Sequence, residues 1–292
     1  MDLKNAATDE ILTTATGRRI GWHARGPRDG APVLWIHGWP GCRLEQRVVP
    51  DEALLRAGVR LVSVDRPGYG NTDPLHAPRS HKALDILAVC DALGLERFSV
   101  IAFSAGGSHA LSLAAIAPDR VERLVLASAL VPHDYDLRSH GEDEALALFR
   151  AGRTPALETF RTERREMILD DPVGVLTTIV PSFGERERAW YGQPWVREVY
   201  EANLREAFRP GIEGDIEDCL TRVEPFDIDV STIACAVRAT HGSADTATPL
   251  ATVERVLAHI RDANLIALDG MEHFGPLLDP DRLLSLALRS AP

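Results

Sequence analysis

One stretch of the chain decides the fold: residues 98–107, F-S-V-I-A-F-S-A-G-G. Its first six residues form the short apolar run of a buried strand, and the small residues that follow are typical of a helix. A strand that turns directly into a helix holds Ser104 on a tight, strained bend at the C-terminal edge of a sheet. We expect Ser104 Oγ to project from that edge, with the backbone N–H of Ala105 directed to where an oxyanion would form.

The same alternation of apolar runs and helical patterns extends outward from this bend. Strands are predicted at residues 32–37, 60–64 and 123–127, and helices at 44–57, 80–93 and 105–117. A hairpin is predicted at residues 11–15 and 19–24, further strands at 234–239 and 264–268, and further helices at 250–260 and 281–288. Buried strands separated by helices predict an α/β fold with a mostly parallel sheet, right-handed crossovers and helices on both faces.

A long segment interrupts this alternation. From residue 132 to 226 the chain is charged and helix-like, and it lacks another clear β–α–β unit. A segment of this length is too long for a plain loop. We therefore predict a core made of residues 1–131 and 227–292, and a helical insertion at 132–226.

Composition excludes several classes of protein. The 292 residues include 32 Lys+Arg and 43 Asp+Glu, a net charge of −11, which leaves no footprint for a phosphate backbone, so no nucleic acid is expected. The N-terminus lacks the apolar run of a signal peptide. Residues 98–118 are uncharged, but their serines, glycines and change of pattern argue against a membrane span. The four scattered cysteines lack the paired spacing of a metal or redox site. From these features together we expect a cytoplasmic protein without membrane association, metal or cofactor.

Three motifs follow one another in a telling order. Residues 102–106, A-F-S-A-G, match the pattern G-x-S-x-G except that Ala102 replaces its first glycine. Residues 240–245, T-H-G-S-A-D, put Asp245 after a predicted strand, and residues 270–274, G-M-E-H-F, put His273 on a loop after the last one. The order Ser104, Asp245, His273 resembles that of the α/β-hydrolase superfamily, specifically its serine esterases with a helical cap at the position of the insertion.

This resemblance implies a role for each residue. Ser104 would be the nucleophile, His273 its base and then acid, and Asp245 the group that orients the imidazole. The turn H-G-W-P-G at residues 37–41 is similar to the family turn that presents an oxyanion-hole N–H, here that of Trp39, beside the N–H of Ala105. The turn at residues 65–70, D-R-P-G-Y-G, is interpreted as structural.

Other candidate residues surround this set. The substrate pocket is predicted from the aromatic side chains of Trp39, Phe103, Trp190, Trp195 and Phe274. His37, His109 and His241 are interpreted as structural. The acidic groups at residues 170–171 and 215–218 are interpreted as solvated surface, since a metal site would need a histidine that neither stretch contains.

The function predicted from the sequence is hydrolysis of a carboxylic ester of a small, largely apolar substrate through an acyl-enzyme. A carbon–carbon bond hydrolase, an aminopeptidase and a cofactor-free perhydrolase remain alternatives with the same three residues. A non-catalytic ligand receptor of the same fold is an alternative of another class. The sequence leaves the substrate and the oligomeric state open, because one fold serves many chemistries.

Overall fold

A computed structural model describes residues 8–131, 144–174 and 184–288. Its centre is an eight-stranded sheet in the order β1-β2-β4-β3-β5-β6-β7-β8. Only β2 runs antiparallel to its neighbours, and the other pairs are parallel, which confirms the predicted fold class. The strands are β1 (Thr8–Thr13), β2 (Arg19–Arg25), β3 (Ala31–Ile36), β4 (Val59–Val64), β5 (Phe98–Phe103), β6 (Val121–Ala127), β7 (Ala236–Gly242) and β8 (Ala263–Leu268).

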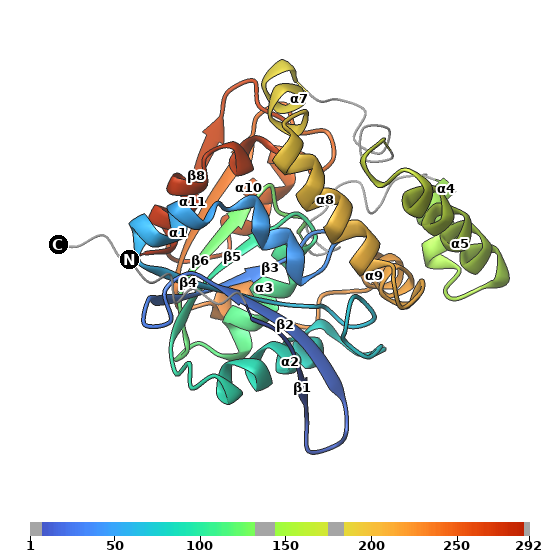
Figure 1. The fold of residues 1–292 in the computed structure, drawn as a ribbon, viewed down its shortest axis with the longest axis horizontal. Helices are drawn as coiled ribbons and strands as arrows, with labels where there is room; N and C mark the ends of the chain where they lie inside the picture. Colours follow the sequence, from blue (N-terminus) through green and yellow to red (C-terminus); the bar gives the residue numbers. More distant parts are fainter. Residues whose placement is uncertain (1–7, 132–143, 175–183, 289–292) are drawn as a thin grey trace.

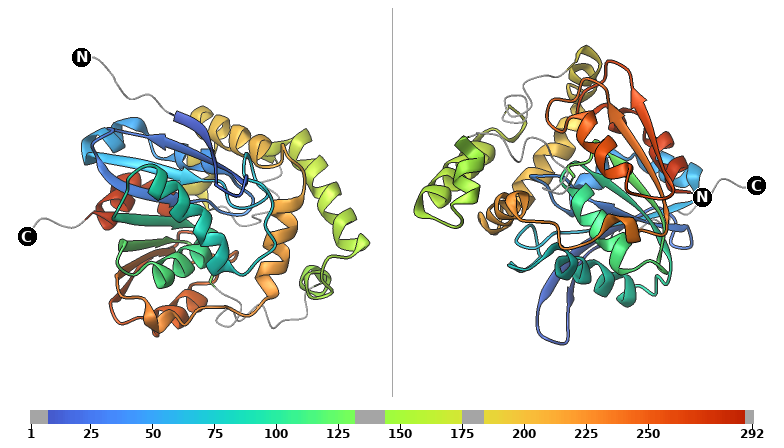
Figure 2. Two further views of the ribbon diagram at one scale, coloured as in Figure 1. Left: turned by 90° about the horizontal axis from the view of Figure 1, so that it is seen from below. Right: turned by 180° about the vertical axis from the view of Figure 1, so that it is seen from behind.

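Helices cover both faces of this sheet (Figures 1 and 2). Alternate residues of each strand point to opposite faces, so Leu34 and Ile36 join one buried cluster while Val33 and Trp35 join the other. The first cluster includes residues of α2 (Arg79–Ala92), α3 (Gly106–Ile116) and α10 (Leu250–Leu257). The second includes residues of α1 (Asp51–Ala57) and α11 (Pro280–Ala287).

One predicted helix was wrong in its extent. Residues 44–57 form two pieces, the 3-10 helix η1 (Arg43–Val48) and the helix α1, instead of one continuous helix. Pro50 precedes α1 as its N-cap residue with extended backbone angles. Proline has no N–H to donate and its ring restricts the residue before it, so a helix ends before Pro50 and a new one begins after it.

Five described α-helices and the 3-10 helix η3 (Val230–Thr232) lie between β6 and β7. The α-helices are α4 (Glu144–Arg150), α5 (Pro155–Asp170), α7 (Glu185–Tyr191), α8 (Pro194–Ala207) and α9 (Glu213–Val223). Of these, α4 and α5 lie outermost and pack on α9 through a small apolar cluster (Figures 1 and 2). The described part of this segment contains no strand, in keeping with the expected helical character. Whether residues 132–226 form a separate domain remains a prediction.

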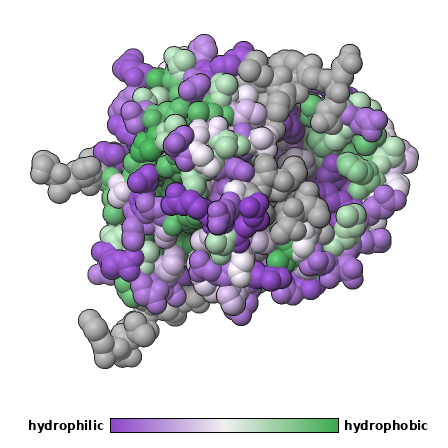
Figure 3. All heavy atoms as spheres, turned by 90° about the horizontal axis from the view of Figure 1, so that it is seen from above, coloured by the Kyte–Doolittle hydropathy of each residue, from purple (hydrophilic) through white to green (hydrophobic). Residues whose placement is uncertain are grey.

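The surface carries both hydrophilic and hydrophobic side chains. In Figure 3, hydrophilic residues predominate along the edges of the molecule and hydrophobic ones gather in patches between them. The large exposed hydrophobic residues lie on different elements, for example Leu84 on α2 and Met167 on α5. Among the described helices, none has the length and apolar character needed to cross a membrane.

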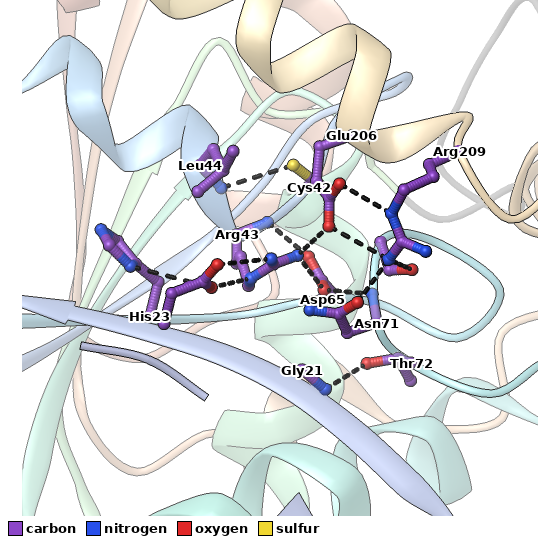
Figure 4. A network of polar contacts seen from close by, with 12 residues as sticks. Gly21, His23, Cys42, Arg43, Leu44, Asp65, Asn71, Thr72, Glu206 and Arg209 are labelled. Carbon is purple, nitrogen blue, oxygen red and sulfur yellow. Dashed lines mark hydrogen bonds and ion pairs between the residues drawn. The ribbon is translucent and has the colours of Figure 1, made fainter. Parts of the chain in front are cut away.

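A buried ion network joins the helical segment to the sheet (Figure 4). Arg43 is 2% exposed, and its Nη1 lies 2.8 Å from Asp65 Oδ2 and 2.9 Å from Glu206 Oε1, while its Nε contacts Asp9. Burial raises the pKa of Asp65 to about 6, although Arg43 favours its ionised form. The network therefore connects β1, η1, the end of β4 and α8 through one guanidinium.

We predict that Arg43→Met lowers the free energy of unfolding by about 3–5 kcal/mol, because Asp65 would remain buried without its cation. Urea denaturation at neutral pH measures this change. Arg56→Met is the matched control, since the Arg56–Asp281 pair is 60% exposed on both sides and should contribute about 1 kcal/mol or less. Equal losses in the two variants would contradict the prediction.

Candidate active site

The structure places Ser104 between β5 and α3 with a backbone φ of +49°. A non-glycine residue in this region is strained by about 1–3 kcal/mol, so its surroundings must hold it there. The N–H of Ser104 donates to Ala127 O at 3.0 Å, and its carbonyl accepts from the N–H of Leu130 at 2.7 Å. The end of β6 therefore holds the strained bend.

Close packing explains the glycines that follow the serine. A Cβ on Gly106 would lie 2.3 Å from the carbonyl oxygen of Ile36, and one on Gly107 would lie 2.5 Å from the Cβ of Ala129. Neither position has room for a side chain, because α3 begins directly against the ends of β3 and β6. Ala102, where the family pattern has glycine, is fully buried within β5.

The three residues of the predicted triad lie together. His273 Nε2 is 3.0 Å from Ser104 Oγ, and His273 Nδ1 is 2.9 Å from Asp245 Oδ2, both within hydrogen-bond range. Asp245 follows β7 and His273 follows β8, so segments far apart in the chain meet at the C-terminal edge of the parallel strands. This arrangement can pass a proton from the hydroxyl to the imidazole.

Asp245 is held from several sides. Its Oδ1 accepts from the N–H groups of Ala247 at 2.8 Å and Thr248 at 2.9 Å, and its Oδ2 accepts from the Thr248 hydroxyl at 2.7 Å. His241 Nε2 lies 3.2 Å from the same Oδ2. Burial alone raises the pKa of Asp245, but the hydrogen bonds from His241 and His273 outweigh it and hold that pKa well below its usual range. An ionised carboxylate thus faces His273 at neutral pH.

The backbone N–H groups of Trp39 and Ala105 lie near Ser104. Within the described residues, the N–H groups of Trp39 and Ala105 make no hydrogen bond. The turn that carries Trp39 lies against the serine, since a Cβ on Gly38 would be 3.3 Å from Ser104 Cβ. Ala105 immediately precedes α3, where the helix dipole favours negative charge.

Known proteins share the sequence pattern and the fold of this chain. A sequence profile for the alpha/beta hydrolase fold matches residues 31–208, more than half of the chain. The chain belongs to the alpha/beta hydrolase family. A relative of this hydrolase, the non-heme chloroperoxidase of Streptomyces lividans, is 28% identical over 286 residues, which cover 93% of this chain and 97% of the relative.

Solved structures share the fold of this hydrolase. An alpha/beta hydrolase fold protein from Nakamurella multipartita superposes with a TM-score of 0.70 and 24% identity, covering 96% of this chain and 99% of that one. A thermophilic esterase from Thermogutta terrifontis superposes with a TM-score of 0.67 and 20% identity, covering 96% of both chains. At these identities the likeness shows the common fold alone.

The turn that carries Trp39 in this hydrolase is held by groups that the sequence analysis missed. Glu45 is 2% exposed, and its Oε2 accepts from Trp35 Nε1 at 3.0 Å and from the N–H of Gly38 at 2.9 Å. Arg66 Nη2 donates to Gly38 O at 2.9 Å. Burial raises the pKa of Glu45 to about 7, despite the two hydrogen bonds that favour its ionised form.

Thr248 is a further missed residue. Its hydroxyl lies 3.1 Å from Ser128 O and 3.3 Å from His273 Nδ1, in addition to its bond to Asp245. Its position three residues after Asp245 was the available signal, because an Asp side chain often accepts from a backbone N–H two or three residues later. Arg66 and Glu45 carry no such local signal, because their partners come from other segments.

Four of the five predicted pocket aromatics, all except Trp39, fall into two groups. Phe103 and Phe274 lie next to the catalytic candidates: the ring of Phe103 is 5.1 Å from that of His273 and 5.5 Å from that of Phe274. Trp190 is buried and 6.2 Å from Phe274, whereas Trp195 is 37% exposed and contacts Trp190 from outside. Their roles in substrate binding remain predictions.

One interpretation of the acidic residues was wrong. Asp170 and Asp171 are exposed as expected, but Asp215, Glu217 and Asp218 are buried. These three face arginine, lysine, histidine and aromatic side chains of the core and of α5. A sequence pattern of acids cannot reveal this, because their partners lie at least 50 residues away in the chain.

The three histidines interpreted as structural differ in what they contact. His37 Nε2 accepts from the N–H of Arg66 at 3.0 Å and its Nδ1 lies 2.9 Å from Gly38 O, as expected for a turn residue. His109 is buried, with its Nε2 3.2 Å from Arg66 Nη1. His241 differs, since it contacts Asp245 itself.

The raised pKa of Glu45 yields a prediction about stability. The pKa of the Glu45 carboxyl is near its ordinary value of 4.5 in the unfolded chain and about 7 in the folded protein, so the folded state keeps the proton to a higher pH. The free energy of unfolding contributed by Glu45 should therefore fall as the pH rises across this window, by about 3 kcal/mol in all. Glu45→Gln keeps an acceptor for Trp35 and Gly38 and should remove this loss.

Urea denaturation of wild type and Glu45→Gln between about pH 4 and about pH 8, a range that includes both pKa values, measures the difference in their free energies of unfolding. The variant should gain stability over wild type as the pH rises. Glu52→Gln, at an exposed position of α1, serves as the control and should follow the wild-type curve. A constant difference between wild type and Glu45→Gln across the range would contradict the prediction.

Proposed function

We propose that this alpha/beta hydrolase cleaves a carboxylic ester of a small, largely apolar substrate through an acyl-enzyme. One observation carries the proposal: the hydrogen-bonded chain Ser104–His273–Asp245 lies beside two backbone N–H groups that donate to no acceptor among the described residues. A nucleophile, a base, a group that orients the base and a pair of oxyanion donors are the parts that acyl transfer needs.

The steps follow from the positions of the atoms. Ser104 Oγ attacks the ester carbonyl carbon while His273 Nε2 takes the hydroxyl proton, and the N–H groups of Trp39 and Ala105 bind the oxyanion. The intermediate collapses, the C–O bond breaks, and His273 returns the proton to the departing alcohol. Water then attacks the acyl-enzyme with His273 as base again, which releases the carboxylic acid and restores Ser104. Asp245 stays ionised and stabilises the imidazolium in both halves.

The surroundings of His273 support a largely apolar substrate. The rings of Phe103 and Phe274 flank the imidazole, at 5.1 Å and 5.6 Å between ring centres. Aromatic walls with few polar groups are typical of sites for small apolar molecules. We infer a small molecule as the partner, and the net charge of −11 gives no support for nucleic acid.

A specific observation favours one second function. The relative from Streptomyces lividans, which matches 93% of this chain, is named a non-heme chloroperoxidase. The same acyl-enzyme could be attacked by hydrogen peroxide in place of water, which would release a peracid. A test for peracid formed from acetate and hydrogen peroxide separates this activity from ester hydrolysis alone.

The remaining alternatives have weaker support. A 2-hydroxy-6-oxononadienedioate/2-hydroxy-6-oxononatrienedioate hydrolase of Cupriavidus pinatubonensis is 38% identical over 134 residues, but the match covers only 42% of this chain. A panel of esters, amides, lactones and β-diketones tests ester, aminopeptidase and carbon–carbon chemistry side by side. A non-catalytic receptor would turn over none of them.

Ser104→Ala tests the proposal directly. We expect kcat for p-nitrophenyl butyrate to fall by about 10⁵-fold or more, since removing such a nucleophile leaves only binding and the oxyanion hole. A fluorophosphonate should label wild type at Ser104 and leave the variant unlabelled. Ser112→Ala is the matched control, a buried serine on α3 whose hydroxyl makes no hydrogen bond within the described chain. Turnover of the ester by Ser104→Ala at the wild-type rate would end the proposal.

A further inference from the structure

Helix α9 turns two buried carboxylates toward the oxyanion-hole turn. Asp215 and Asp218 are three residues apart, so they lie on one face of the helix, and they are 0% and 7% exposed. Each connects to the peptide that joins Gly38 and Trp39, by a different route. That peptide carries one of the two proposed oxyanion donors, the N–H of Trp39.

Asp215 holds the side chain of Trp39. Its Oδ1 accepts from Trp39 Nε1 at 2.5 Å and from Arg164 Nη1 at 2.6 Å. Its Oδ2 lies 3.6 Å from Arg161 Nη1 and makes no hydrogen bond within the described chain. The two guanidinium groups also lie over the indole ring, at 5.2 Å for Arg164 and 5.7 Å for Arg161. The indole is therefore fixed by one hydrogen bond and two cation–π contacts.

Asp218 holds the carbonyl end of the same peptide through Arg66. The carboxylate pairs with both terminal nitrogens of Arg66, and its Oδ2 also accepts from the hydroxyl of Tyr69 at 2.7 Å. Arg66 Nη2 in turn donates to Gly38 O at 2.9 Å. Bidentate pairs of this kind fix direction as well as distance.

Planarity turns these two connections into control of the oxyanion donor. In a trans peptide the carbonyl and the N–H point in opposite directions within one plane. Anchoring Gly38 O therefore sets the direction of the Trp39 N–H, and anchoring the indole sets the rotation of Trp39 about its own backbone. An oxyanion donor must be in place before the charge develops, so its orientation affects the rate of reaction more than binding of the ground state.

We propose that Asp215 and Asp218 are positioning residues that make helix α9 part of the oxyanion hole, acting through Trp39 and Arg66. This inference rests on the proposed function, since it concerns how the same site reaches its transition state. It assigns to the helical segment a role in turnover in addition to any part in covering the substrate.

Three substitutions separate positioning from a structural role. Asp215→Ala removes both the acceptor for Trp39 and the carboxylate between Arg161 and Arg164. Asp215→Asn keeps the acceptor oxygen and loses the charge. Its amide NH2 replaces Oδ2, an atom that makes no hydrogen bond in the described chain. Trp39→Phe keeps the charge and loses the indole N–H. Glu213→Ala, on the same helix in an exposed pair with Arg153, is the control.

We expect kcat for p-nitrophenyl butyrate to fall about 10–100-fold in Asp215→Ala and Trp39→Phe, with KM within about threefold, because a misdirected donor raises the barrier without weakening ground-state binding. Asp215→Asn should recover most of the lost kcat. Stability against urea should group the variants differently from kcat. Both Asp215 variants should be destabilised, and Trp39→Phe should stay close to wild type. Glu213→Ala should match wild type in both measurements.

Other outcomes are equally informative. If kcat follows stability, so that Asp215→Asn is as slow as Asp215→Ala, or if Trp39→Phe turns over at the wild-type rate, the inference is wrong. Trp39→Phe carries the test alone if the Asp215 variants do not fold. Failure of the proposed function looks different: wild type would then neither hydrolyse the ester nor react with the fluorophosphonate at Ser104.

Discussion

The left-handed backbone at Ser104 is the constraint on which the rest of the site depends. A φ of +49° at a serine is maintained because Ala127 at the end of β6 and Leu130 just after it hydrogen-bond the bend, and because α3 begins against the end of β3. That contact leaves room for glycine alone at residue 106. The same bend exposes the hydroxyl and leaves the N–H of Ala105 without a described hydrogen-bond partner. The strained backbone conformation therefore positions both the candidate nucleophile and one proposed oxyanion donor.

Parallel pairing brings the other parts to this point. Strands β3, β5, β6, β7 and β8 are neighbours that pair in parallel, so their carboxyl ends lie at one edge of the sheet. The turn with Trp39 follows β3, Asp245 follows β7 and His273 follows β8. This strand order brings His273 within 3.0 Å of Ser104 and within 2.9 Å of Asp245.

Buried charge is the second organising feature. Arg43, which pairs with Asp65, reaches α8 through Glu206, and Arg66 reaches α9 through Asp218. Arg164 and Asp215 join α5 to α9. Buried pairs of this kind add little net stability over apolar packing, but removing one partner is costly, so they specify geometry more than they strengthen the fold. Here two of them meet the turn that carries the proposed oxyanion donor.

Local patterns in the sequence were sufficient for the strands, the helices of the core apart from the break at Pro50, and the order of the three catalytic candidates. Strand β5 was predicted with its observed ends, and G-M-E-H-F placed His273 on a loop, because apolar periodicity and turn residues act over a few positions. The break at Pro50 was also a local signal, and it was overlooked. Other features have no local pattern, as with Glu45 beneath Gly38.

What the sequence by itself determined is therefore the α/β alternation, the strained serine bend and the three residues that could share a proton. Only the tertiary structure decided where the acids of α9 lie. An acidic run reads as solvated unless its partners are known, and the partners of Asp215 and Asp218 lie up to 176 residues away. Burial is a property of the assembled fold, since a carboxylate leaves water only where distant cations and donors have been brought to meet it.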